Sequence, residues 1–321
     1  MDPRDFGRVG VLAGGPSSER DISLESGQAV FNALKNAGAD VLLFDIAGNL
    51  TREDLKKFDM DVAFIALHGR FGEDGVIQGM LEDLGMPYTG SRPLPSRLSV
   101  DKIASKEIFA KNGIEAPAYE VLARGGFNPA DLEKICKAFG FPLVVKPRFE
   151  GSSIGISIVE DREALREAIS AAFVYGDKII VEEYINGREL TVGIYDDKPL
   201  PVVEIVVSEP FYNFKAKYKK DDTEYIVPAK VSSCHYNAAQ AKGMLAHRAL
   251  GCESFSRVDI ILDERQDKLF VLEVNSIPGL TGHSLLPKAA ACAGIGFSQL
   301  CLKIVELALK KRGVTKIGKE I

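Results

Sequence analysis

The sequence lacks the features that would place the protein in a membrane, outside the cell or on nucleic acid. No run approaches roughly 18 consecutive apolar residues, and Met1-Asp2-Pro3-Arg4-Asp5 contains no apolar signal core. The formal net charge is −5, so no overall positive field favours nucleic acid. We therefore expect an intracellular protein that binds neither membranes nor nucleic acid.

Cysteines are few, and no two are spaced as C-x-x-C. The five cysteines lie at positions 136, 234, 252, 292 and 301. An odd number without paired spacing is typical of reduced core residues, not of a disulfide framework or a cysteine metal site. A Walker G-K-[ST], a G-x-G-x-x-G turn, H-E-x-x-H and a nucleophile elbow are also missing, which argues against a P-loop, a nicotinamide enzyme and common hydrolases.

The order of the expected elements indicates an α/β and α+β protein of three lobes. At 321 residues and 46% hydrophobic, the chain can bury a large core. Short apolar strands alternate with amphipathic helices through about residue 90, which predicts a doubly wound lobe with a parallel sheet. Paired strands with a covering helix follow. We expect domains at 1–100 (N-terminal α/β), 101–190 (central, small α+β) and 191–321 (C-terminal, with the metal-type strands), with sites at their junctions.

Two apolar strands near the C-terminus carry polar groups at a spacing of two. Glu273 and Asn275 share one face of their strand, and Arg257 and Asp259 share one face of the preceding strand. A buried carboxylate needs a cation or an ion pair, and oxygen ligands of this kind suit Mg²⁺ that keeps some phosphate oxygens. The alternative interpretation is a structural salt bridge between Arg257 and one acid.

Several segments between residues 100 and 190 could hold a nucleotide. The loop Glu150–Gly155 is rich in small residues whose backbone N–H groups can bind phosphate. An ordinary surface hairpin would have the same composition and is the alternative. Lys102 and Lys146 can neutralise phosphates as point charges, and each taken singly could equally be a solvated lysine. The carboxylates that could contact ribose or adenine are Glu182, Glu183 and Glu189.

Together these segments resemble the ATP-grasp superfamily and, within it, the D-alanine–D-alanine ligase family. The resemblance covers nearly the whole chain. The segments that carry it are 14–23 (GGPSSERDIS), 67–75 (LHGRFGEDG), 146–155, 211–225, 257–259 (RVD) and 273–285.

The resemblance implies an ATP-grasp fold and specific roles for the ATP contacts. Lys102, Lys146 and Lys217 would contact phosphates, Glu182 would contact adenine, and Glu189 would contact ribose. The backbone around Glu183 to Ile185 would complete the adenine pocket. Two Mg²⁺ ions, replaceable by Mn²⁺, are implied, one held by Asp259 and Glu273 and the other by Glu273 and Asn275.

The resemblance also assigns the residues around the amino acid substrates. Glu19, Ser152 and Tyr218 would orient the first D-alanine, and His68 would lie near it. Without the resemblance, His68 would be interpreted as a hydrogen-bonded core or turn histidine. Arg257 and the Gly279 backbone would be oxyanion donors, and Ser284 and Leu285 would contact the carboxylate of the second substrate.

The implied reaction is ATP-dependent synthesis of D-alanyl-D-alanine through an acyl phosphate, with release of ADP and phosphate. Water would destroy that intermediate, so the polar stretch 208–230, with its several aromatic residues, is expected to form a lid. Tyr218 favours an amine as second nucleophile. A homodimer, a bacterial cytoplasm and supply of peptidoglycan precursors are implied. Two alternatives remain open: another ATP-grasp carboxylate–amine ligase (such as D-Ala–D-Ser), and a non-catalytic nucleotide-binding sensor.

Overall fold

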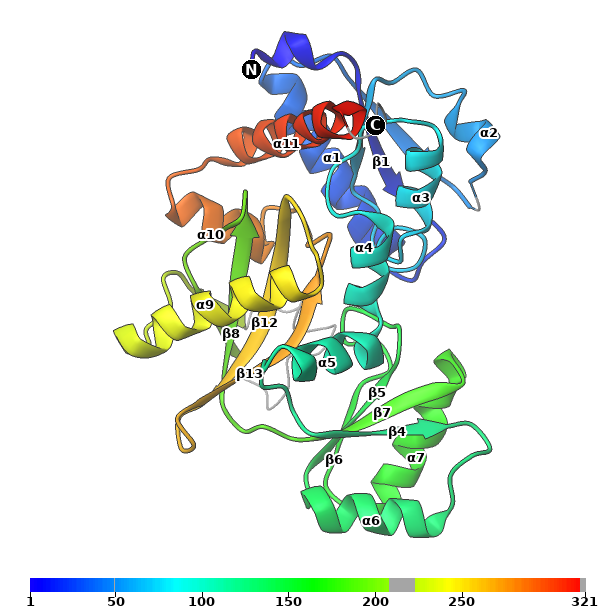
Figure 1. Cartoon of the computed structure of the whole chain (residues 1–321), viewed down its shortest axis with the longest axis vertical. Coiled ribbons are helices and arrows are strands. Elements are labelled where there is room, and N and C mark those ends of the chain that lie inside the picture. The colour runs from blue at the N-terminus through cyan, green and yellow to red at the C-terminus, as the bar shows by residue number, and fades with distance from the viewer. Residues whose placement is uncertain (49, 208–222, 318–321) are drawn as a thin grey trace.

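The structure is a computed structural model that describes residues 1–48, 50–207 and 223–317, with side chains omitted at 207 and 312–317. These residues form three sheets, and Figure 1 shows a lobe at each end of the molecule with the largest sheet between them. One sheet is parallel and the other two are antiparallel. The predicted mixture of an α/β lobe with α+β lobes in an ATP-grasp arrangement is confirmed.

The N-terminal lobe is built on a parallel sheet with strand order β2-β1-β3. Its elements are η1 (Pro3–Phe6), β1 (Val9–Gly14), α1 (Arg20–Asn36), β2 (Val41–Ile46), α2 (Arg52–Leu55), β3 (Val62–Ile65), α3 (Val76–Asp83) and α4 (Pro93–Val100). Helix α1 packs closely on β1 because position 27 is glycine: a Cβ there would lie 2.3 Å from the Cβ of Ala13. This close packing fixes where the residues after β1 emerge from the sheet.

The central lobe has a four-stranded antiparallel sheet of order β4-β7-β5-β6, covered by two helices. Its elements are α5 (Lys102–Lys111), β4 (Tyr119–Ala123), α6 (Pro129–Phe139), β5 (Leu143–Pro147), β6 (Ser157–Val159), α7 (Arg162–Ala172), η2 (Phe173–Tyr175) and β7 (Lys178–Glu183). Asp101 is the N-cap of α5 and accepts hydrogen bonds from the backbone N–H groups of Ile103 and Ala104.

The C-terminal part contains the largest sheet, of order β11-β10-β8-β12-β13, with β9 paired to β8. Its elements are β8 (Arg188–Tyr195), β9 (Lys198–Pro199), β10 (Val203–Val207), β11 (Thr223–Ile226), α9 (Ser233–Ala249), β12 (Phe255–Asp263), β13 (Lys268–Asn275), α10 (Leu285–Cys292) and α11 (Phe297–Ile317). Helix α9 covers one face of this sheet (Figure 1). Gly243 allows the close contact, since a Cβ there would lie 3.0 Å from the Cβ of Val192.

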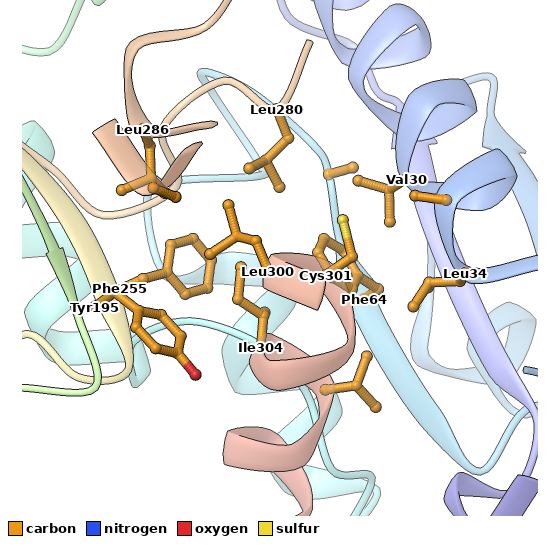
Figure 2. Packing of buried hydrophobic residues seen from close by; sticks show 14 of the residues in the cluster. Val30, Leu34, Phe64, Tyr195, Phe255, Leu280, Leu286, Leu300, Cys301 and Ile304 are labelled. Atoms are coloured by element: carbon orange, nitrogen blue, oxygen red, sulfur yellow. The ribbon is translucent and has the colours of Figure 1, made fainter. Parts of the chain in front are cut away.

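The last helix returns to the N-terminal lobe and joins the two ends of the chain in one core. Figure 2 shows Leu300, Cys301 and Ile304 of α11 between Val30 and Leu34 of α1 and Tyr195 and Phe255 of the large sheet. Cys301 is buried there and Cys252 is buried elsewhere, as expected for core residues. Cys234 and Cys292 are exposed and Cys136 is only partly buried, so the expectation of a core position is wrong for these three. The N-terminal lobe is therefore held against the C-terminal sheet by apolar packing.

No single helix of the described chain is long and apolar enough to cross a membrane. Only α10 followed by α11 reaches that length and composition, and these two helices are bent by 103°.

Candidate functional site

A cavity of about 350 Å³ lies between the central sheet and the large C-terminal sheet. Residues of β5, β6 and β7 form one wall, and residues of β10, β12 and β13 form the opposite wall. The predicted residues that line it are Lys146, Glu182, Glu183, Ile185, Glu189, Arg257, Asp259, Glu273 and Leu285. The fold thus brings together, at one junction between lobes, residues that lie more than a hundred positions apart in the sequence.

The two predicted metal strands are neighbours, and their polar residues face each other. β12 and β13 pair antiparallel, with Asp259 opposite Glu273 and Arg257 opposite Asn275. The register shifts after Asp259, where a bulge interrupts the ladder. Among the described residues, no group of three or more His, Cys, Asp or Glu side chains is arranged to hold a metal ion. The predicted set offers two carboxylates and an amide, so a bound Mg²⁺ would need further oxygens from a ligand.

Asp259 is the most heavily hydrogen-bonded of these side chains. Arg257 Nε and Nη2 donate to its two oxygens at 2.8 and 2.7 Å, Thr191 Oγ1 donates at 2.6 Å, and Asn275 Nδ2 donates at 3.1 Å. The salt bridge that was the alternative interpretation is therefore present. It does not account for Glu273, which among the described residues lies beside Lys102, with Nζ–Oε2 at 3.6 Å.

Lys102 connects the metal strands to the loop at 150–155. Its ammonium donates to the Glu150 carbonyl at 2.6 Å and is buried near the start of α5. Burial raises the pKa of the neighbouring Glu150 carboxyl, and the positive charge of Lys102 opposes that rise. Lys102 thus lies between Glu273 and the small-residue loop.

Glu182 lies at the base of the cavity between two lysines. Lys146 Nζ is 2.6 Å from its Oε2, and Lys106 Nζ is 3.0 Å from its Oε1. Desolvation would raise the pKa of Glu182, but the two ammonium groups outweigh it and lower the pKa below its ordinary value. Sequence reasoning found Lys146 and missed Lys106, although its spacing of four from Lys102 places both lysines on one face of α5.

The remaining predicted nucleotide residues lie along β7 and β8. Glu183 Oε1 accepts the Ala118 backbone N–H at 2.8 Å, so this side chain supports the β4 edge, while the backbone continues to Ile185 along the cavity wall. Glu189 lies opposite Ile205 of β10 and lines the same cavity. Side chains and backbone of these residues therefore form part of the cavity wall.

The loop 150–155 separates this cavity from a second one of about 550 Å³. Ser152 (φ 50°) and Ser153 (φ 61°) adopt the left-handed conformation, which non-glycine residues rarely take and which is common at functional sites. Ser152 Oγ donates to Glu19 Oε1, and Glu19 lines the second cavity. The predicted Glu19–Ser152 pair is therefore formed, while its third member Tyr218, like Lys217, lies outside the described residues.

His68 is buried beside the second cavity and does not line it. Its Nδ1 is 3.3 Å from Glu73 Oε1, and its Nε2 is 3.1 Å from Ser26 Oγ. Ser26 Oγ also accepts the Leu280 backbone N–H at 3.3 Å. The histidine is thus a satisfied buried residue as well as a neighbour of the site. Ser26, a polar residue on the buried face of α1, connects His68 to the Leu280 backbone, and sequence reasoning missed this link.

The segment from Gly279 to Leu285 closes the C-terminal side of the site. Ser284 Oγ accepts the Thr281 backbone N–H at 3.0 Å, and Ser284 is the N-cap residue of α10. Gly279 has no room for a side chain, because a Cβ would lie 2.8 Å from Ser284 Oγ. The N-terminus of α10 and the Gly279 backbone therefore lie close together, an arrangement suited to anionic groups.

Two antiparallel sheets that enclose a lysine- and carboxylate-lined cavity, next to a parallel N-terminal lobe, define an ATP-grasp protein. Family comparison agrees. The model described as "D-ala D-ala ligase C-terminus" matches residues 108–306, and "D-ala D-ala ligase N-terminus" matches residues 47–91. The chain belongs to the D-alanine–D-alanine ligase family.

Individual relatives are similar over almost their full length. The chain is 44% identical to a D-alanine–D-alanine ligase of Geobacter sulfurreducens over 310 residues, covering 95% of this chain and 96% of the relative. It is also 44% identical to one of Nitrosomonas europaea, covering 96% and 99%. The crystal structure of the Bacillus anthracis D-alanine–D-alanine ligase superposes with a TM-score of 0.85 at 36% identity, and its ATP complex with 0.84 at 34%; each covers 96% of this chain and 99% of the other.

Proposed function

We propose that this protein joins two D-alanine molecules to D-alanyl-D-alanine through an acyl-phosphate intermediate, with conversion of ATP to ADP and phosphate. The observation that carries the proposal is the meeting of Asp259 and Glu273 with Lys146 and Glu182 in one cavity of a D-alanine–D-alanine ligase family member. Near-complete coverage of the ATP-bound relative supports ATP as the nucleotide.

The cavity suits ATP on its own chemistry. The Glu182 carboxylate is buried and lines the cavity, so it can accept a hydrogen bond from an exocyclic amine such as that of adenine. Lys102 and Lys146 supply positive charge for the phosphates, and Glu189 would contact the ribose. Lys217 is proposed for the γ-phosphate.

The facing carboxylates fit Mg²⁺ bound together with phosphate oxygens. Asp259 and Glu273 would hold one ion and Glu273 and Asn275 the other, with Mn²⁺ able to substitute. Asn275 uses its Nδ2 to bond Asp259, which leaves its amide oxygen available as a ligand. Bound there, the metal would offset charge on the transferring phosphoryl group.

The protein's own residues then account for the rest of the chemistry. Glu19, held by Ser152, and Tyr218 would orient the first D-alanine, whose carboxylate is phosphorylated to an acyl phosphate. Attack by the amine of the second D-alanine gives a tetrahedral oxyanion, for which Arg257 and the Gly279 backbone N–H are the proposed donors. Ser284 and Leu285, at the N-terminus of α10, would bind the carboxylate of the second substrate.

The wider biological setting is part of the same proposal. We infer a homodimer in a bacterial cytoplasm that supplies peptidoglycan precursors. We also retain three domains at 1–100, 101–190 and 191–321; β8 begins at Arg188, so the second boundary would fall just inside a strand.

The test is phosphate release from MgATP with D-alanine, with L-alanine, and with D-alanine plus D-serine or D-lactate, the products being identified by mass. D-alanine-dependent release with D-alanyl-D-alanine as the product is expected. A preferred D-alanyl-D-serine product would assign the protein to another acceptor class. ATP binding without any amino acid-dependent release would indicate the nucleotide-binding sensor.

A further inference from the structure

The ion cluster at Glu182 contains one more positive charge than the carboxylate needs. Glu182 is buried, with its side chain 1% exposed, and contacts both Lys106 and Lys146. One lysine would suffice to neutralise it. A second buried ammonium is costly to desolvate, so its presence calls for a reason.

The two lysines differ in what they can reach. The Lys146 side chain is 12% exposed and lines the cavity. The Lys106 side chain is 2% exposed and lies behind Glu182, outside the cavity wall. It is held in place by the Pro117 carbonyl, to which its Nζ donates at 3.2 Å, and by the face of the Tyr119 ring, 5.3 Å from Nζ. Lys106 is fixed, whereas Lys146 is placed to change partner.

The charged groups around Glu182 come from three elements. Lys106 faces it from α5, Lys146 from β5, and the Tyr119 phenol from β4, while Lys102 of α5 acts on Lys106. Burial lowers the pKa of Lys106, and the charges of Lys146 and Lys102 lower it further, while Glu182 opposes them. The ammonium form of Lys106 therefore depends on Glu182 being ionised, and the ionised Glu182 depends on its lysines.

We propose that Lys106 is a positioning residue for ATP: it is the permanent counter-ion of Glu182 and frees Lys146 to bind the nucleotide's phosphates. This inference rests on the proposed ATP site. When Lys146 turns from Glu182 to a phosphate, the carboxylate keeps Lys106 as its partner and stays ionised. It then remains a pure acceptor for the adenine amino group.

The proposal predicts a specific defect when Lys106 is replaced by an uncharged residue of similar length. In Lys106→Met, Lys146 is the one cation left in contact with Glu182 among the described residues. Binding of ATP would draw Lys146 away and leave a buried, unpaired carboxylate, whose pKa burial raises. Glu182 would then take up a proton from solvent as ATP binds. ATP affinity should fall by about tenfold or more, and further as pH rises from 6 to 8, because the proton becomes less available.

The experiment is isothermal titration calorimetry of MgATP binding without D-alanine, in two buffers of different ionisation enthalpy. Subtracting the wild-type proton count removes the contribution of the nucleotide's own protonation. When it binds ATP, the Lys106→Met variant should take up as much as one proton more than the wild type. Lys106→Arg, which keeps the positive charge, should take up no additional proton. Wild-type affinity and proton count in Lys106→Met would overturn the proposal.

A double-mutant cycle with Glu182→Gln separates positioning from packing. If Lys106 acts through the Glu182 charge, replacing it in the Glu182→Gln background should cost little affinity and cause no extra proton uptake. Equal losses in both backgrounds would mean that Lys106 only packs. This cycle keeps the proposal testable if Lys106→Met folds poorly, because the double variant contains no unpaired buried carboxylate.

The binding measurement separates this inference from the proposed ligase reaction. A wild-type protein that binds MgATP but forms no dipeptide would overturn the reaction while leaving the calorimetric result for Lys106 to stand. A wild-type protein that ligates D-alanine with a Lys106→Met variant that behaves like it would overturn the inference alone.

Discussion

Ser26→Ala tests whether the N-terminal lobe controls the segment that carries the proposed oxyanion donor. The Ser26 hydroxyl is fully buried in α1 and bonds two groups, His68 Nε2 at 3.1 Å and the Leu280 backbone N–H at 3.3 Å. Leu280 directly follows Gly279. Removal of one oxygen atom thus releases the only contact described between α1 and the Leu280 backbone N–H.

The size of the effect follows from the groups left without partners. Each unsatisfied buried polar group costs about 1–3 kcal/mol, so losing both bonds should destabilise the fold by about 2–6 kcal/mol. The unfolding entropy of a chain of 321 residues corresponds to about 1.5 °C per kcal/mol, so the Tm should fall by roughly 3–9 °C. A loosened Gly279 segment should in addition lower kcat by about tenfold or more, because small displacements of catalytic groups are expensive.

Ser23→Ala is the matched control. Ser23 is equally buried in the same helix and also makes two hydrogen bonds, accepting from the Gly14 N–H at 2.8 Å and donating to the Ala66 carbonyl at 2.7 Å. Both partners belong to the N-terminal lobe. Ser23→Ala should lower the Tm by an amount similar to Ser26→Ala, and it should keep the wild-type kcat.

The assays are thermal unfolding and D-alanine-dependent phosphate release at saturating ATP and D-alanine. A lower kcat in Ser26→Ala than in Ser23→Ala, at comparable Tm, supports positioning across the lobes. Equal kcat values in the two variants would refute it and reduce Ser26 to a structural residue of α1.

Three further predictions concern the metal strands and a buried histidine. Glu273→Gln should abolish turnover with Mg²⁺ while leaving the Tm near that of the wild type; appreciable activity would remove Glu273 from the metal site. Thr191→Val should lose about 1.5–3 kcal/mol of unfolding free energy in urea, because Thr191 Oγ1 donates to the charged Asp259 at 2.6 Å, whereas Thr191→Ser should keep most of it. Burial lowers the pKa of His247 to about 4 from an ordinary 6.5, so the unfolded chain binds this proton first and stability falls as pH drops below 6.5. The loss should reach about 2 kcal/mol at pH 5 and should be smaller in His247→Gln.

The positions of the candidate site residues were largely predictable because many of them lie on regular strands. A spacing of two along a strand determines which side chains share a face, and this placed Glu273 with Asn275 and Arg257 with Asp259. The pairing of these strands, with Asp259 opposite Glu273, confirms that reasoning. What periodicity could not indicate is which oxygens are already engaged, since Thr191 comes from β8, nearly seventy residues earlier in the chain.

The residues that were missed are buried and act through other side chains. Lys106 and Ser26 lie on helix faces where an apolar residue is the ordinary expectation, and their partners come from distant elements. Sequence spacing marks such a residue as unusual without identifying its partner. The partner follows only from the packing of α5 against the central sheet and of α1 against the Gly279 segment.

The candidate site is assembled from residues of all three lobes. The described residues proposed to touch ATP lie in the central and C-terminal lobes, whereas Glu19 and Ser26 reach the same region from the N-terminal lobe. That lobe is anchored by apolar contacts of α11 with α1 (Figure 2). A core substitution that loosens this anchor, far from any proposed ligand, should therefore weaken D-alanine binding more than ATP binding, because only the D-alanine contacts include groups from the N-terminal lobe.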